Sequence, residues 1–89
     1  MYTIRSVSED GVYYLVNGWR KHKAFWSKTA DPVRNGFKTD GLAERQLDKL
    51  LATMPEYGKD KLTLVMFDLE NRKLVPVREY GIVKPFWEW

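Results

Sequence analysis

The side chains that could carry out catalysis are few and poorly placed for it. His22 is the single histidine, and it lies between Lys21 and Lys23, whose charges disfavour the imidazolium form. No carboxylate lies near it in sequence to orient the ring as a general base requires. The paired carboxylates Glu9 and Asp10 are typical of a solvated turn. The sequence therefore predicts a protein that is not an enzyme.

Motifs for metals, cofactors and membranes are also missing from the sequence. The chain contains no cysteine, which removes thiolate nucleophiles and cysteine-based zinc or iron–sulfur sites and fits a reducing compartment. No glycine-rich phosphate loop, HExxH or GxSxG spacing is present, and nothing resembles a calcium loop. No window approaches the roughly 20 apolar residues of a membrane span. We therefore expect a soluble cytoplasmic protein without a metal, a cofactor or a membrane segment.

Positive charge and aromatic side chains are concentrated between Trp19 and Lys38. This segment holds six basic residues and one acidic residue, whereas the rest of the chain holds nine basic and eleven acidic. Three aromatic and five basic residues form the candidate surface: Trp19, Phe25, Trp26, Arg20, Lys21, Lys23, Lys28 and Arg34. Single-strand binders combine such cations on phosphates with aromatic rings stacked on bases. The alternative is that the rings pack on the core and the lysines solubilise an edge strand.

The C-terminal stretch supplies a second candidate surface, with three aromatic residues in four positions: Phe86, Trp87 and Trp89. Four tryptophans exceed what one small core needs, and tryptophan is prominent in protein–protein hot spots. Alternatively, the three rings fold back over the open face of the sheet. Both interpretations stay open, and a self-associating tail is part of the first.

One helix, at about residues 40–54, is predicted to organise the elements that position these residues. Five apolar residues at helical spacing form one stripe: Ala43, Leu47, Leu50, Leu51 and Met54. Thr39 or Asp40 can cap its N-terminus, Phe37 can pack at its entry, and Pro55 cannot continue it.

Alternating or apolar runs predict five strands, at residues 1–7, 12–16, 19–26, 61–67 and 73–80. Asn17-Gly18 predicts a two-residue hairpin, and the mixed polarity of the third strand places it at a sheet edge. Residues 61–67 are apolar on both faces and predict a central strand, while Pro76 predicts an edge or a bulge. Residues 27–36 form the longest predicted loop, of a kind that is often functional.

The order β-β-β-α-β-β predicts an α+β fold, with a mostly antiparallel sheet packed on one helix. We expect a single domain over residues 1–89, with an aromatic C-terminal tail at residues 81–89.

A resemblance to known proteins covers about residues 1–67. The succession MYTIRS, GVYYLVNGWRKHKAF, FKTDGLAERQLDKL and KDKLTLVMF resembles short accessory proteins of bacteriophages and prophages. The resemblance implies a stand-alone protein that binds a host macromolecule, for example to inhibit a defence nuclease or a polymerase. It carries over no binding or catalytic residue.

These observations favour a small non-enzymatic binding protein of the cytoplasm, or of the host cytoplasm if it is phage-encoded. Its surface would be formed by the third strand, the loop after it and the aromatic C-terminus, and it would block a site on a protein partner. One alternative is a nucleic-acid-binding module that uses the basic-aromatic strand, and another is a structural subunit of a larger assembly. Either a monomer or a homodimer is compatible with the sequence.

Overall fold

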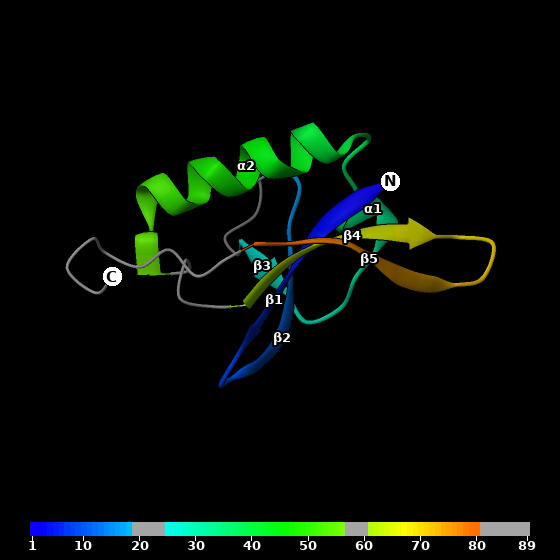
Figure 1. The fold of residues 1–89 in the computed structure, drawn as a ribbon, viewed down its shortest axis with the longest axis horizontal. Coiled ribbons are helices and arrows are strands. Elements are labelled where there is room, and N and C mark those ends of the chain that lie inside the picture. The colour runs from blue at the N-terminus through cyan, green and yellow to red at the C-terminus, as the bar shows by residue number, and fades with distance from the viewer. Residues whose placement is uncertain (19–24, 57–60, 81–89) are drawn as a thin grey trace.

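Five strands form one antiparallel sheet in the computed structural model, which describes residues 1–18, 25–56 and 61–80. The strands are β1 (Tyr2–Ser8), β2 (Gly11–Leu15), β3 (Trp26–Ser27), β4 (Lys61–Asp68) and β5 (Lys73–Tyr80). They lie in the order β3-β2-β1-β4-β5. Helix α2 (Asp40–Thr53) crosses one face of the sheet, and the short helix α1 (Pro32–Asn35) lies near the N-terminus (Figure 1). The predicted α+β fold, with an antiparallel sheet and one main helix, is confirmed.

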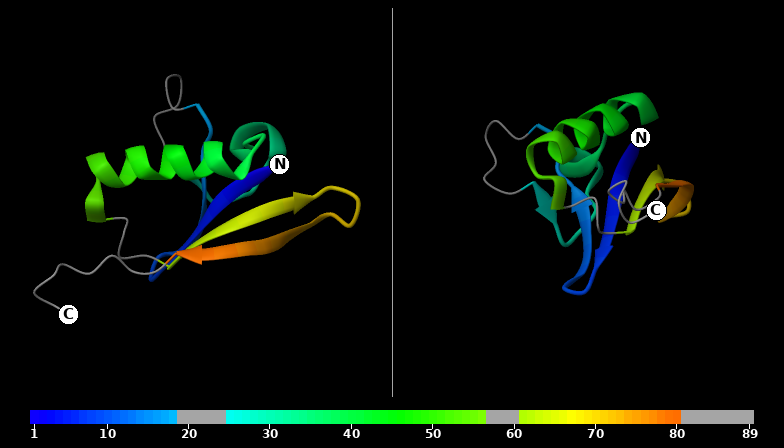
Figure 2. Two further views of the ribbon diagram at one scale, coloured as in Figure 1. Left: turned by 45° about the horizontal axis from the view of Figure 1, so that its top comes forward. Right: turned by 60° about the vertical axis from the view of Figure 1, so that its left-hand side comes forward.

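Helix α2 forms where the sequence predicts it, because its cap and its apolar stripe agree. The N-cap is Thr39, whose Oγ1 accepts a hydrogen bond from the N–H of Leu42 at 3.2 Å. The predicted stripe lies against the core, with three residues buried and the last two half-buried: Ala43, Leu47, Leu50, Leu51 and Met54. Burying each large side chain contributes about 1.5–3 kcal/mol, so the stripe fixes the helix over the sheet (Figure 2).

The main core lies between α2 and the sheet. Ile4 of β1 and Leu64 of β4 are paired across the strands and are fully buried. The buried cluster contains Ile4, Leu15, Phe37, Ala43, Leu47, Leu50, Leu62 and Leu64. Phe37 belongs to it because a bridge holds the entry to α2 on β1: each N–H of Phe37 and Tyr2 donates to the other residue's carbonyl at 2.8 Å.

Strand β4 is central and β5 is an edge strand, as predicted. Residues 62–65 are buried without a break, so both faces of β4 are covered. Beside β5 the register shifts, because Leu64 pairs with Arg78 whereas Val65 pairs with Pro76. Val77 of β5 therefore has no opposite residue on β4, which makes a β-bulge beside Pro76, the residue that lacks an N–H.

The connection between β2 and β3 differs from the prediction. A two-residue turn at Asn17-Gly18 would place residues 16 and 19 opposite each other in the two strands. Instead, Leu15 pairs with Trp26. Residues 16–25 therefore join the strands, and the predicted hairpin is wrong. The reason is tertiary: the N–H of Asn17 donates to the carbonyl of Arg34 at 2.9 Å, so this residue contacts α1 instead.

The third strand also has different bounds from those predicted. Within the described residues, β3 comprises only Trp26–Ser27, and residues 19–24 lie outside them. It is an edge strand, as predicted. The segment 27–36, predicted as a loop throughout, begins in β3 and contains α1.

Candidate binding groove

Four of the predicted site residues lie within the described part of the chain. Phe25 and Trp26 are half-buried and pack against the core cluster, so only part of each ring is accessible. Lys28 and Arg34 are exposed, and neither takes part in an ion pair among the described residues. The other seven lie outside the described residues: Trp19, Arg20, Lys21, Lys23, Phe86, Trp87 and Trp89.

One buried asparagine holds the segment after β3 in place. Asn35 is fully buried, and its Nδ2 donates to the carbonyls of Tyr14 and Leu15 at 3.1 and 2.9 Å and to Oγ of Ser27 at 2.9 Å. Its Oδ1 accepts from the N–H of Asp31 at 3.0 Å. The side chain therefore links β2, β3 and the start of α1 through a single amide group, with both its nitrogen and its oxygen satisfied.

The two ends of α1 are also specified by side chains. Asp31 is the N-cap, and its Oδ1 accepts from the N–H of Val33 at 2.8 Å. Beyond the helix, Nδ2 of Asn17 donates to the carbonyl of Gly36 at 2.7 Å. The four-residue helix is too short to be stable alone, so these tertiary contacts position it.

A groove of about 260 Å³ lies between this segment and the β4–β5 hairpin. Residues from both sides line it: Ala30, Pro32, Phe67, Asp68, Leu69, Arg72, Lys73 and Leu74. The lining is mostly apolar, and Leu69 is 64% exposed. A cavity of about 150 Å³ suffices for a benzene ring, so the groove can take one large apolar side chain.

The turn between β4 and β5 is held by one carboxylate. Asp68 accepts hydrogen bonds from Asn71 at both oxygens, from the backbone N–H at 3.2 Å and from Nδ2 at 2.9 Å. The side-chain hydrogen bond, followed by the backbone one, lowers the pKa of Asp68 below its ordinary value of 3.8. Asp68 is therefore a charged turn-former at neutral pH, not an acid catalyst.

Two cations of the groove have no side-chain partner among the residues that the structure describes. Arg72 and Lys73 are exposed, and among residues 1–18, 25–56 and 61–80 neither forms an ion pair or a side-chain hydrogen bond. Arg72 also has φ 53°, in the left-handed region that favours glycine. The groove thus combines a mostly apolar lining with two exposed positive charges.

The sequence pointed to only one side of this groove. The sequence predicts a functional loop at residues 27–36, which contains Ala30 and Pro32. The opposite side, 67–74, read as a strand end and a hairpin turn. The sequence feature that could have indicated this side is the basic pair Arg72-Lys73, at a turn position where glycine is common. The same turn also contains Asp68, Glu70 and Asn71.

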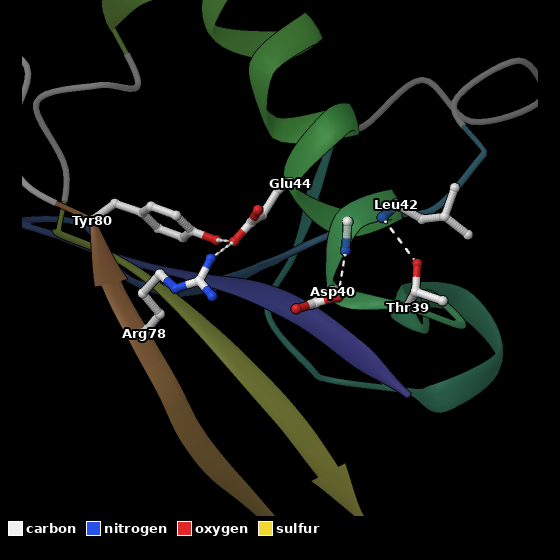
Figure 3. A network of polar contacts seen from close by, with 7 residues as sticks. Thr39, Asp40, Leu42, Glu44, Arg78 and Tyr80 are labelled. Atoms are coloured by element: carbon white, nitrogen blue, oxygen red, sulfur yellow. Dashed lines mark hydrogen bonds and ion pairs between the residues drawn. The ribbon is translucent and has the colours of Figure 1, made fainter.

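A separate polar cluster joins α2 to β5 (Figure 3). Glu44 accepts hydrogen bonds from Arg78 and, at 2.7 Å, from the hydroxyl of Tyr80. Burial, and then the hydrogen bond to Glu44, raise the pKa of Tyr80 above its ordinary value. Both side chains of β5 thus bind one carboxylate of α2, so this cluster fastens the helix to the edge strand.

The described residues contain neither a metal-binding cluster nor a helix that could span a membrane. No group of three or more His, Cys, Asp or Glu side chains there is placed to hold a metal ion. No helix in that part of the chain is long and apolar enough to cross a membrane.

The fold and the groove define the class of this molecule: a small α+β protein whose antiparallel sheet carries one long helix and, at the β4–β5 end, an apolar groove whose two cations are unpaired among the described residues. Comparison with protein-family models gives no match, and neither curated proteins nor solved structures give one.

Proposed function

We propose that this protein is a small non-enzymatic binding protein that blocks a site on a host macromolecule. The observation that carries the proposal is the groove between the segment after β3 and the β4–β5 hairpin. Exposed apolar and basic groups gather there: Leu69 is 64% exposed, and the charges of Arg72 and Lys73 are unpaired among the described residues. Apolar surface next to unpaired charge is typical of recognition surfaces.

The identity of the host macromolecule follows from the sequence resemblance and belongs to the same proposal. Short accessory proteins of phages and prophages act in the host cytoplasm, and a defence or nucleic-acid-processing protein would be the target. The surface of residues 25–36, which contains the exposed Lys28 and Arg34, would lie in the interface beside the groove.

The test is affinity capture from bacterial lysate with the tagged full-length chain, with and without nuclease, at rising salt. We expect one discrete protein to be retained through nuclease treatment. The double substitution Lys28→Glu with Arg34→Glu should reduce its recovery, because both charges would reverse within the interface. The matched control is Arg45→Glu with Lys49→Glu, which reverses two exposed charges on α2. Equal loss in both variants, or no retained protein, would contradict the proposal.

A nucleic-acid-binding module is the second candidate, and Lys28 and Arg34 favour it, because both are exposed and neither forms an ion pair in the described part of the chain. It predicts that nuclease removes the captured material and that moderate salt releases it, because few phosphate contacts are available. The half-burial of Phe25 and Trp26 weighs against it, since stacking on bases needs accessible ring faces.

A further inference from the structure

The groove has the size and lining for one side chain of a partner, not for a whole cofactor. Its volume of about 260 Å³ lies below the roughly 300–1,000 Å³ of typical small-molecule pockets. Phe67, Leu74 and Pro32 supply apolar lining, which favours an aliphatic or aromatic side chain.

Positive charge is in excess beside this apolar lining. The lining contains two cations, Arg72 and Lys73, and one anion, Asp68. Asp68 already accepts two hydrogen bonds from Asn71, whereas the cations are unpaired in the described part of the chain. A partner with carboxylates next to the inserted side chain would complement this charge.

The backbone of Arg72 is a second and independent observation. With φ 53°, this residue occupies a conformation that L side chains rarely adopt and that glycine adopts without strain. Strained positions of this kind cluster at ligand-binding sites. Glycine would suffice for the left-handed backbone at this position, yet the chain places a guanidinium there, beside the groove.

We propose that the groove recognises a short acidic peptide segment of a protein partner, with one large apolar side chain packed against Phe67 and Leu74 and flanking carboxylates bound by Arg72 and Lys73. This inference rests on the proposed function and names the chemistry of its partner. A guanidinium forms two parallel hydrogen bonds to a carboxylate, which gives Arg72 the stronger role of the two cations.

The probe is a blocked peptide with a central leucine flanked on each side by glutamates, added to the ¹⁵N-labelled full-length chain and followed by NMR. We expect saturable shifts of the amides of Leu69, Arg72, Lys73 and Leu74. Replacing the central leucine by serine should weaken binding severalfold, since it removes the buried apolar area. A peptide with lysines in place of glutamates should cause no saturable shift at these amides.

The decisive variant is Arg72→Gly, which suits the left-handed conformation and should leave the thermal midpoint unchanged or raised. We expect it to weaken the affinity for the acidic peptide about twofold to fivefold at low salt, with a smaller difference in affinity at high salt. The control Arg45→Gln removes the same charge from α2 and should leave peptide affinity unchanged.

Three results with the peptides would overturn the inference: no saturable shift with the glutamate peptide, equal binding of the lysine peptide, or equal affinity of the Arg72→Gly variant. In each of these cases lysate capture that is sensitive to Lys28 and Arg34 would leave the proposed binding function standing. Shifts at the groove amides that instead depend on the protein concentration alone would assign the groove to a second copy of this chain and equally overturn the peptide proposal.

Discussion

At the scale of single residues, Asn35 decides how the segment after β3 lies. Its Nδ2, with two N–H donors, lies within hydrogen-bond distance of three acceptors on β2 and β3, and its Oδ1 accepts one hydrogen bond at the start of α1. Removing the amide takes this partner from the carbonyl of Tyr14 and from the N–H of Asp31, whereas the carbonyl of Leu15 keeps the hydroxyl of Thr3 at 3.2 Å. An unsatisfied buried polar group costs more than the hydrogen bond itself contributes.

We therefore expect Asn35→Ala to lower the free energy of unfolding by about 1–3 kcal/mol. Urea denaturation followed by tryptophan fluorescence measures the change. Asn71→Ala is the control, because among the described residues its side chain bonds only Asp68, through an exposed hydrogen bond, and it should cost about 1 kcal/mol or less. Equal costs for the two substitutions would show that the buried amide has no special role.

Tyr80 makes stability depend on alkaline pH. Burial and its hydrogen bond to Glu44 raise its pKa in the folded chain above the ordinary value of 10. The folded state then holds the phenolic proton more tightly than the unfolded state, so this stability is present below pH 10 and is lost as pH rises toward the folded pKa. Tyr80→Phe should remove part of the fall in unfolding free energy between roughly pH 9 and 11. Denaturant titrations at both pH values provide the measurement, and parallel losses in the two proteins would contradict it.

At the scale of elements, the backbone turn after α1 requires glycine. An ideal Cβ on Gly36 would lie 2.1 Å from the carbonyl oxygen of Pro32, a backbone atom that cannot turn away, and 3.1 Å from Sδ of Met1. The crowding is purely steric, since Gly36 has φ −79°, which any residue adopts. A side chain here therefore has to displace α1.

We expect Gly36→Ala to destabilise the protein by about 1–3 kcal/mol. Gly41→Ala is the matched control, because the nearest atom to its Cβ is Oγ1 of Thr39 at 4.0 Å and alanine favours the helix. That control should be neutral or stabilise by up to about 1 kcal/mol. Thermal unfolding followed by circular dichroism compares both variants, and a neutral Gly36→Ala would refute the clash.

At the scale of the whole molecule, one core between α2 and the sheet carries most of the stability. A chain of this size has a free energy of unfolding of about 5–10 kcal/mol, so a single large cavity removes much of it. Leu50 lies in that core at 1% exposure, whereas Leu69 of the groove is 64% exposed.

Leu50→Ala should therefore cost about 2–5 kcal/mol, through lost burial and the cavity left behind. Leu69→Ala should cost less than about 0.5 kcal/mol, since its side chain is mostly in solvent. Urea midpoints of the two variants give the comparison. If Leu69→Ala were as costly as Leu50→Ala, the β4–β5 turn would be part of the core and not a binding surface.

The sequence alone determined those helices and strands that are specified by residues close to one another along the chain. The period and cap of α2, the apolar run of β4 and the proline of β5 each act through neighbours along the chain, and all three predictions are confirmed. Local signals are sufficient there because helix periodicity and a missing N–H act within a few residues.

Only the tertiary structure decided the site. Asn17-Gly18 predicts a hairpin turn and Asn35 lies in the predicted loop 27–36, yet each asparagine bonds groups far away in sequence, which moves the start of β3 and shapes α1. The groove likewise joins Pro32 to Leu74, and no spacing rule along the chain brings these residues together. A side-chain amide satisfies a local turn and a distant carbonyl equally well, so its partner depends on which backbone groups the fold leaves unpaired.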